Sequence, residues 1–207
     1  MKHLVEKLKR EGILKTPRII KAFTEINRAD FMLEEFKDDY EEDIPMSINY
    51  GQTISQPLTV AFMLELLQPQ EGDRIMDVGS GSAWSSALLA YIVGEEGKVY
   101  AVERIPQLKT FGENNLKKYG FSNIELFCGD GTRGLAEFAP FNCIQVAAAA
   151  QKKIPESLKE QLEIGGRLVI PVGQGSQEMI LLTKKTKNNF KEEKYPGFQF
   201  VPLIEEE

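Results

Sequence analysis

A chain of 207 residues with 42% hydrophobic and 27% charged residues has the composition of a globular protein of one domain. Its one histidine, His3, stands near the N-terminus, so imidazole catalysis, a serine hydrolase triad and a multi-histidine metal site lack their residues. A net charge of −6 disfavours nucleic acid as a partner, and no apolar run reaches the roughly 20 residues that a membrane span needs.

The N-terminal segment predicts two short helices. Leu4, Val5 and Leu8 share one helical face before Gly12, and a second helix begins at Thr16-Pro17. The first residues interleave charges with apolar residues, unlike a secretory signal peptide, so we expect a soluble, cytoplasmic protein. An acidic stretch at 34–43, interpreted as a solvated loop, leads into a polar segment and an apolar helix near 58–67.

From residue 74 onward, short apolar runs alternate with helical stretches, which is typical of a parallel sheet covered by helices on both faces. Five runs are expected to be parallel strands: 74–79, 98–103, 124–130, 141–148 and 167–173. The last two runs, 177–185 and 198–204, are joined by polar residues and predict an antiparallel pair. The predicted fold is α/β: a Rossmann-like, doubly wound, seven-stranded sheet with N-terminal helices.

The two cysteines, Cys128 and Cys143, are too few and too far apart for a redox motif or a zinc cluster. Both fall in apolar runs, so we interpret both as reduced core residues. No metal site is expected.

Polar residues lie at or near the ends of three of the predicted strands, at the edge of the sheet where ligands of such folds bind. Asp77 precedes a glycine-rich turn that contains Gly79 and Gly81, and Trp84 stands where a dinucleotide site would need a third glycine. Glu103 is suited to accept hydrogen bonds from ribose hydroxyls, and Asp130 from an adenine amine. The pattern indicates an adenosine site. Each carboxylate also has a structural alternative: a turn cap, a solvated charge and a helix N-cap, respectively.

The segment Tyr50-Gly51-Gln52-Thr53-Ile54-Ser55-Gln56-Pro57 resembles the one that the protein-L-isoaspartate O-methyltransferase family places over its active site. Further stretches are similar in order and spacing, over about residues 19–204: VYAVERIPQL, GDGTRG, the alanine run after CIQV, LEIGGRLVIPVG and FVPLI. The resemblance implies methyl transfer from S-adenosylmethionine, which leaves S-adenosylhomocysteine, to the carboxylate of L-isoaspartyl residues in damaged proteins and peptides. D-aspartyl residues are possible secondary substrates.

The resemblance implies that the Ser55 hydroxyl orients the substrate carboxylate, whereas the residues alone favour helix capping for this serine. It also places Gln52, Thr53, Ile54 and Gln177 near the substrate, and solvent-facing polar roles are the alternative for Gln52, Thr53 and Gln177. With the strand-end pattern, it predicts a set of cofactor residues: Asp77, Gly79, Ser80, Gly81, Ser82, Glu103, Arg104, Asp130 and Gly131.

The chain departs from the family pattern in three places. Ala83 replaces the usual glycine, Trp84 the usual tyrosine, and AAAAQ at 147–151 a more usual Thr-Ala-Ala-Ala-Pro. A methyl group at Ala83 costs about 1 to 2 kcal/mol if that residue has a positive φ or touches the ligand. We expect weakened cofactor binding at most.

The expected organisation is one monomeric domain over 1–207, with N-terminal helices and a substrate-covering loop in 1–56 and the cofactor-binding core in 57–207. Two alternatives stay open because a fold does not fix an acceptor. One is a methyltransferase that modifies a small-molecule acid or a protein amide. The other is a cofactor-binding module that has lost turnover.

Overall fold

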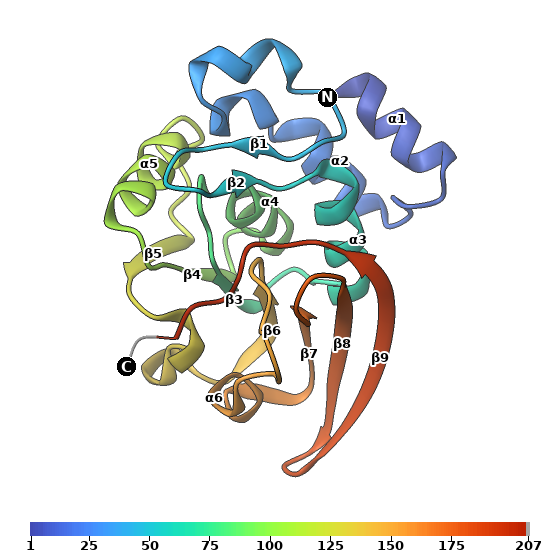
Figure 1. Ribbon diagram of the computed structural model, residues 1–207, viewed down its shortest axis with the longest axis vertical. Coiled ribbons are helices and arrows are strands. Elements are labelled where there is room, and N and C mark those ends of the chain that lie inside the picture. The colour runs from blue at the N-terminus through green and yellow to red at the C-terminus, as the bar shows by residue number, and fades with distance from the viewer. Residues whose placement is uncertain (206–207) are drawn as a thin grey trace.

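The computed structural model describes residues 1–205, and its centre is a seven-stranded sheet in the order β5-β4-β3-β6-β7-β8-β9 (Figure 1). Strands β3 to β7 run parallel to one another, and β8 is antiparallel to both of its neighbours. The strands are β3 Arg74–Val78, β4 Lys98–Glu103, β5 Ile124–Cys128, β6 Phe141–Val146, β7 Leu162–Val172, β8 Gln177–Thr186 and β9 Asn189–Phe198. The predicted, mostly parallel, doubly wound sheet is confirmed.

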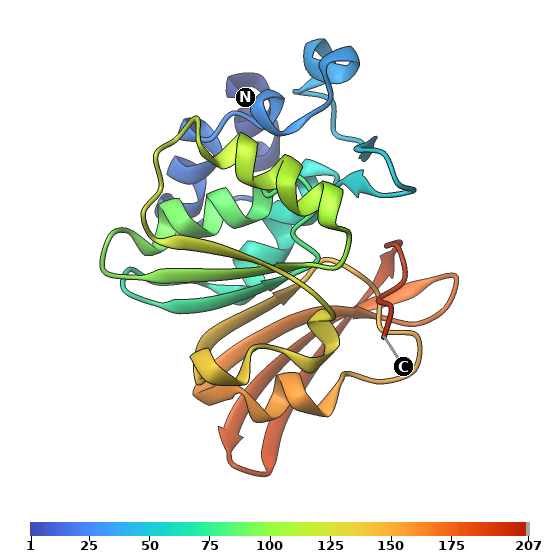
Figure 2. The same cartoon turned by 90° about the vertical axis from the view of Figure 1, so that its left-hand side faces the viewer.

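Helices cover both faces of this sheet, as Figure 2 shows. On one face pack α3 Pro57–Leu67, α4 Trp84–Val93 and α5 Pro106–Leu116, and on the other η3 Gly131–Arg133, η4 Ala136–Phe138 and α6 Glu156–Glu160. Neighbouring residues of a strand point to opposite faces, so Ile75 joins the first hydrophobic cluster and Met76 the second. Because both faces are buried, the central strands are continuously apolar.

The N-terminal elements α1 Lys2–Arg10, α2 Pro17–Glu25, η1 Arg28–Phe31 and η2 Glu34–Asp39 lie on the α4 side. Helix α2 packs on α4, where the rings of Phe23 and Trp84 meet edge to face with their centres 5.6 Å apart. A short antiparallel ribbon, β1 Met46–Ser47 with β2 Thr53–Ile54, follows. Among residues 1–205, no helix is both long and apolar enough to cross a bilayer.

The prediction for the last strand was wrong in its placement. Strand β9 occupies the segment that was expected to connect the last two strands, and the turn lies at 187–188. As an edge strand, β9 carries exposed charged residues such as Lys191 and Lys194, which gives it the polar composition of a loop. The helical stretches expected after β5 and after β6 are short, since η3 and η4 are single 3-10 turns and α6 ends at Glu160, before β7 begins at Leu162.

Residues 199–204, here called the C-terminal strap, lie outside the sheet. They run from the end of β9 toward the middle of the sheet (Figure 1). The strap is held by Ala149, whose amide donates to the Val201 carbonyl and whose carbonyl accepts from the Leu203 amide, both at 2.8 Å.

The core interpretation of the cysteines is confirmed for Cys143, which is buried, and wrong for Cys128, which is exposed at the end of β5.

Candidate active site

A cavity of about 240 Å³ opens at the carboxyl ends of β3, β4 and β6, where the strand order reverses. Residues 42–55, here called the covering loop, and the C-terminal strap complete its walls. Eleven of the predicted site residues line it: Gln52, Thr53, Ile54, Ser55, Gly79, Ser80, Gly81, Ser82, Glu103, Arg104 and Gly131. Asp77, Asp130 and Gln177 are not among its lining residues, and their side chains have other partners.

The glycine-rich turn after β3 is held open toward the cavity. Gly79 and Gly81 have φ angles of 80° and 53°, which glycine adopts without strain. The amides of Gly79 and Ser80 donate to the Val102 carbonyl at 2.8 and 3.2 Å, which ties the turn to β4. Ala83 has a φ of 69°, so the predicted backbone strain is present, but Ala83 does not line the cavity.

Glu103 is only 5% exposed, which excludes the solvated-charge interpretation. Its Oε2 accepts from the Gly81 amide and its Oε1 from the Ile105 amide, both at 2.9 Å. Each carboxylate oxygen has a second lone pair, so both can still accept from a ligand hydroxyl. Glu103 therefore fixes the glycine turn and presents acceptors to the cavity.

Asp77 is fully buried beneath the same turn. Its Oδ2 accepts from the hydroxyls of Ser85 at 3.0 Å and Ser86 at 2.6 Å. Its Oδ1 accepts from the side-chain Nε2 of Gln145 at 3.1 Å. Burial raises the pKa of the Asp77 carboxyl, against the effect of these hydrogen bonds. In this arrangement Asp77 joins β3, α4 and β6.

Asp130 acts as the N-cap of η3, which was its structural alternative. Its Oδ1 accepts from the amide of Thr132 at 2.8 Å and from the hydroxyl at 2.7 Å, and its Oδ2 lies 3.5 Å from Arg133 Nε. The glycines on either side, Gly129 and Gly131, line the cavity. A Cβ on Gly131 would lie 2.3 Å from Val78 Cγ1, so this close approach requires glycine.

Gln177 binds the strap instead of facing the cavity. Its Oε1 accepts from the Phe200 amide at 2.7 Å, and its Nε2 donates to the Phe200 carbonyl at 3.0 Å. The strap residues that follow, 201–204, all line the cavity. Gln177 therefore contributes to the site through the strap.

Ser55 lines the cavity, and the capping alternative is wrong. The N-cap of α3 is Gln56, with no capping bond from its side chain, and the amide of Leu58 in the first turn is instead bound by the carboxylate of Asp43 at 2.8 Å. Because Asp43 supplies the cap, the Ser55 hydroxyl can serve a ligand. The acidic stretch thus includes a structural carboxylate.

Three buried polar atoms at the cavity have no hydrogen-bond partner within the described residues: Ser80 Oγ, Trp84 Nε1 and Gln145 Oε1. Buried polar groups in folded proteins are nearly always bonded, to protein or to something else. All three residues line this one cavity, so unpaired polar groups are concentrated in its walls.

Several lining residues were missed from the sequence: Ile48, Trp84, Gly129, Gln145, Ala147, Ala148 and the strap residues 201–204. The strand-end rule that identified Glu103 also applies to Ala147 and Ala148, which directly follow β6. The strap carries no such signal, because its apolar residues suggest a strand.

The family model described as protein-L-isoaspartate(D-aspartate) O-methyltransferase matches residues 1–207. The protein-L-isoaspartate O-methyltransferase of Thermococcus onnurineus is 44% identical over 207 residues, covering 99% of this chain and 93% of the relative. That of Aeropyrum pernix is 43% identical over 205 residues, covering 98% and 78%. A solved structure from Plasmodium falciparum, described as such an enzyme in complex with S-adenosyl-L-homocysteine, matches with a TM-score of 0.87 at 26% identity, covering 98% and 97%.

Proposed function

The chain belongs to the protein-L-isoaspartate(D-aspartate) O-methyltransferase family, and on this premise we propose that its cavity transfers the methyl group of S-adenosylmethionine to the carboxylate of an L-isoaspartyl residue. The observation that carries the proposal is that Ser55, on the covering loop, and Glu103, at the end of β4, line one cavity. The reaction begins the repair of a damaged protein. D-aspartyl residues are proposed as secondary substrates.

The residues present fit S-adenosylmethionine. Glu103 offers acceptors for two ribose hydroxyls, and the glycine turn allows a ligand to approach the backbone closely. Ser80, Trp84 and Gln145, each of which has a buried polar atom without a hydrogen-bond partner within the described residues, line the same cavity. When bound, the cofactor supplies a methyl group on a positively charged sulfur.

We assign to the cofactor side Gly79, Ser80, Gly81, Ser82, Glu103, Arg104 and Gly131, and to the acceptor side Gln52, Thr53, Ile54 and Ser55. Asp77 and Asp130 support the cofactor side from behind: Asp77 joins α4 to β6 beneath the glycine turn, and Asp130 caps the loop after β5. Gln177 supports the acceptor side through the strap.

The chemistry asks little of the protein beyond positioning. A carboxylate is ionised at neutral pH and needs no base to act as a nucleophile, so a site without histidine is sufficient. Donation from the Ser55 hydroxyl would fix one carboxylate oxygen in line with the reacting carbon. Charge is neutralised in the reaction, so exclusion of water by the covering loop and the strap favours it.

The test is transfer of a labelled methyl group to an isoaspartyl peptide, with the matched aspartyl peptide as the control. We expect labelling of the isoaspartyl peptide only, and Ser55→Ala to lower kcat/KM by about 10- to 100-fold, the effect of one hydrogen bond to a charged group. Binding of S-adenosylhomocysteine, measured by calorimetry, is expected to be unchanged in Ser55→Ala. Normal cofactor binding without transfer to the isoaspartyl peptide would refute the proposed acceptor.

We further propose that the enzyme acts as a monomeric single domain on isoaspartyl-containing proteins and peptides. Family membership and the relatives' names favour this acceptor over a small-molecule acid or a protein amide. Sedimentation of the purified protein would test the monomer.

A further inference from the structure

Arg28 is a fully buried arginine whose guanidinium joins the two ends of the covering loop. Its Nη1 donates to the Glu42 carbonyl at 2.9 Å and its Nη2 to the Ile44 carbonyl at 2.8 Å, at the start of the loop. The same Nη2 donates to the Ser55 carbonyl at 3.2 Å, at the end of the loop. One side chain thus closes the loop by three backbone contacts.

The same guanidinium also contacts the cofactor side of the cavity. Its central carbon lies 5.5 Å from the ring centre of Trp84, a distance typical of a cation–π contact. Trp84 lines the cavity and is the first residue of α4, directly after the glycine turn. Arg28 itself is not a lining residue, so it touches the walls of the cavity from behind.

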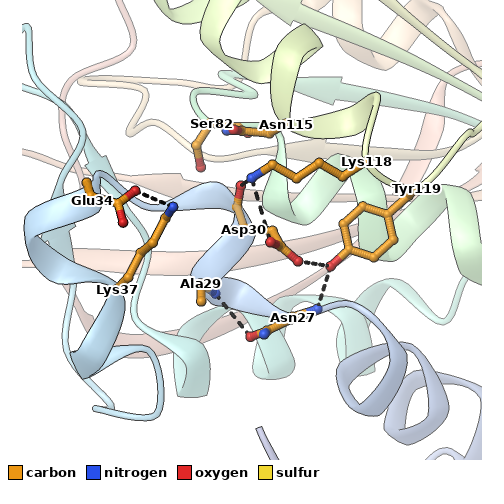
Figure 3. A network of polar contacts seen from close by, with 9 residues as sticks. All are labelled: Asn27, Ala29, Asp30, Glu34, Lys37, Ser82, Asn115, Lys118 and Tyr119. Carbon is orange, nitrogen blue, oxygen red and sulfur yellow. Dashed lines mark hydrogen bonds and ion pairs between the residues drawn. The ribbon is translucent and has the colours of Figure 1, made fainter.

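The 3-10 turn η1, which begins with Arg28, is tied to the segment after α5 by the polar network in Figure 3. The Tyr119 hydroxyl donates to Asp30 Oδ2 at 2.7 Å and accepts from the Asn27 amide at 2.9 Å. Lys118 Nζ donates to the Asp30 carbonyl at 2.7 Å. Tyr119 lies three residues after Leu116, the last residue of α5, so this network links η1 to the end of that helix.

A buried cation is costly for folding. Burial lowers the pKa of Arg28 to about 10, although the Asp43 carboxylate nearby favours the charged form. Arg28 Nε also lacks a hydrogen-bond partner within the described residues. An apolar side chain would avoid this cost but would leave the carbonyls of Glu42, Ile44 and Ser55 without their donor, so the hold on the covering loop accounts for an arginine here.

We propose that Arg28 is a positioning residue for methyl transfer: by fixing Glu42, Ile44 and Ser55 against Trp84, it sets where the Ser55 hydroxyl stands over the cofactor side. The inference rests on the proposed function and extends it to a residue outside the cavity. Arginine is required because its planar fork presents several donors in fixed directions, whereas lysine presents its donors at one point.

The test compares Arg28→Lys and Arg28→Met with a control that is matched in burial and bonding. Lys184 is 6% exposed and donates to the carbonyls of Lys159, Glu160 and Leu162, away from the cavity. Lys184→Met therefore removes a buried cation that donates to three backbone carbonyls, without touching the site. Kinetics are measured with an isoaspartyl peptide at a temperature where every variant is folded.

We expect both Arg28 variants to lower kcat/KM for the peptide by about 10- to 100-fold, the order that a misplacement of about 1 Å costs, with a raised KM. Binding of S-adenosylhomocysteine is expected to stay within about threefold of wild type, because the Gly81–Glu103 contact is intact. Lys184→Met is expected to lower Tm and leave kcat and KM unchanged.

Trp84 is the single tryptophan of the chain, so its fluorescence reports on this contact without any turnover. We expect acrylamide to quench it more strongly in both Arg28 variants and not in Lys184→Met. The inference would be overturned by unchanged quenching or by full activity of Arg28→Lys. It would also be overturned if the activity of the Arg28 variants fell only in proportion to their unfolded fraction, at constant KM. Wild type that fails to methylate the peptide would refute the proposed function, and quenching would still decide whether Arg28 holds the loop.

Discussion

At the scale of single residues, burial of Asp77 disfavours the charged form of its carboxyl group. Its raised pKa means that the folded state binds the proton more tightly than the unfolded chain does. The stability due to this group is therefore fully present below the ordinary aspartate pKa, about 3.9, and is lost as the pH rises through the raised value. Retention of the carboxylate is consistent with its support of the cofactor turn.

Asp77→Asn keeps the shape of the side chain and its acceptor for Gln145, and removes the charge. The hydroxyls of Ser85 and Ser86 can rotate to accept from the new amide. We expect a Tm a few degrees above wild type at pH 8, with the difference vanishing toward pH 4. Thermal unfolding at both pH values is the measurement, and a lower Tm at pH 8 would contradict the role of burial.

Single residues also show where sequence reasoning succeeds. Glu103 and the glycine turn could be predicted, because a parallel sheet brings the ends of its strands together whatever the details of packing. The partners of Asp77 and Asp130 could not, because Gln145 lies 68 residues away from Asp77 in the chain, and the choice between ligand and cap for Asp130 depends on where its loop turns. Ser55 does not cap α3, because Asp43, 15 residues before Leu58 in the chain, accepts the Leu58 amide instead.

At the scale of elements, the strap depends on Gln177. Gln177→Leu keeps the volume and removes both bonds to Phe200, and leaves the contacts at Ala149 intact. We expect KM for the isoaspartyl peptide to rise about tenfold, the effect of one to two net hydrogen bonds, with little change in Tm. Peptide kinetics and limited proteolysis of the C-terminus are the measurements.

Gln174→Leu is the control for this strap variant, because Gln174 lies in the exposed turn before β8 and bonds to Gln151. It is expected to leave KM unchanged. An unaltered KM in Gln177→Leu, or an equal change in both variants, would show that the strap does not shape the acceptor side.

Elements at the edge of the fold were the hardest to predict. Strands β3, β4 and β6 are buried on both faces, so their apolar runs are unambiguous. Within residues 1–205, strand β9 pairs with β8 alone, and its exposed positions carry polar residues. The strap is apolar because it packs at the cavity, so its composition resembles that of a strand. Composition therefore predicted a connecting loop where β9 lies and a strand where the strap lies.

At the scale of the whole molecule, the site exists because three distant parts of the chain meet at one edge of the sheet. The order β4-β3-β6 opens a crevice at the strand ends, the N-terminal elements carry the covering loop to it, and the strap closes it from the C-terminal side (Figure 1). The sequence pattern could predict the crevice. The single-domain organisation over 1–207 stays a prediction.

The most direct test of this arrangement is a crystal structure with S-adenosylhomocysteine and an isoaspartyl peptide bound. We predict the ribose hydroxyls on the Glu103 carboxylate and the peptide carboxylate within hydrogen-bond distance of the Ser55 hydroxyl, about 2.6 to 3.2 Å, facing the cofactor sulfur. A cofactor bound elsewhere, or a Ser55 hydroxyl turned away from the peptide, would contradict it.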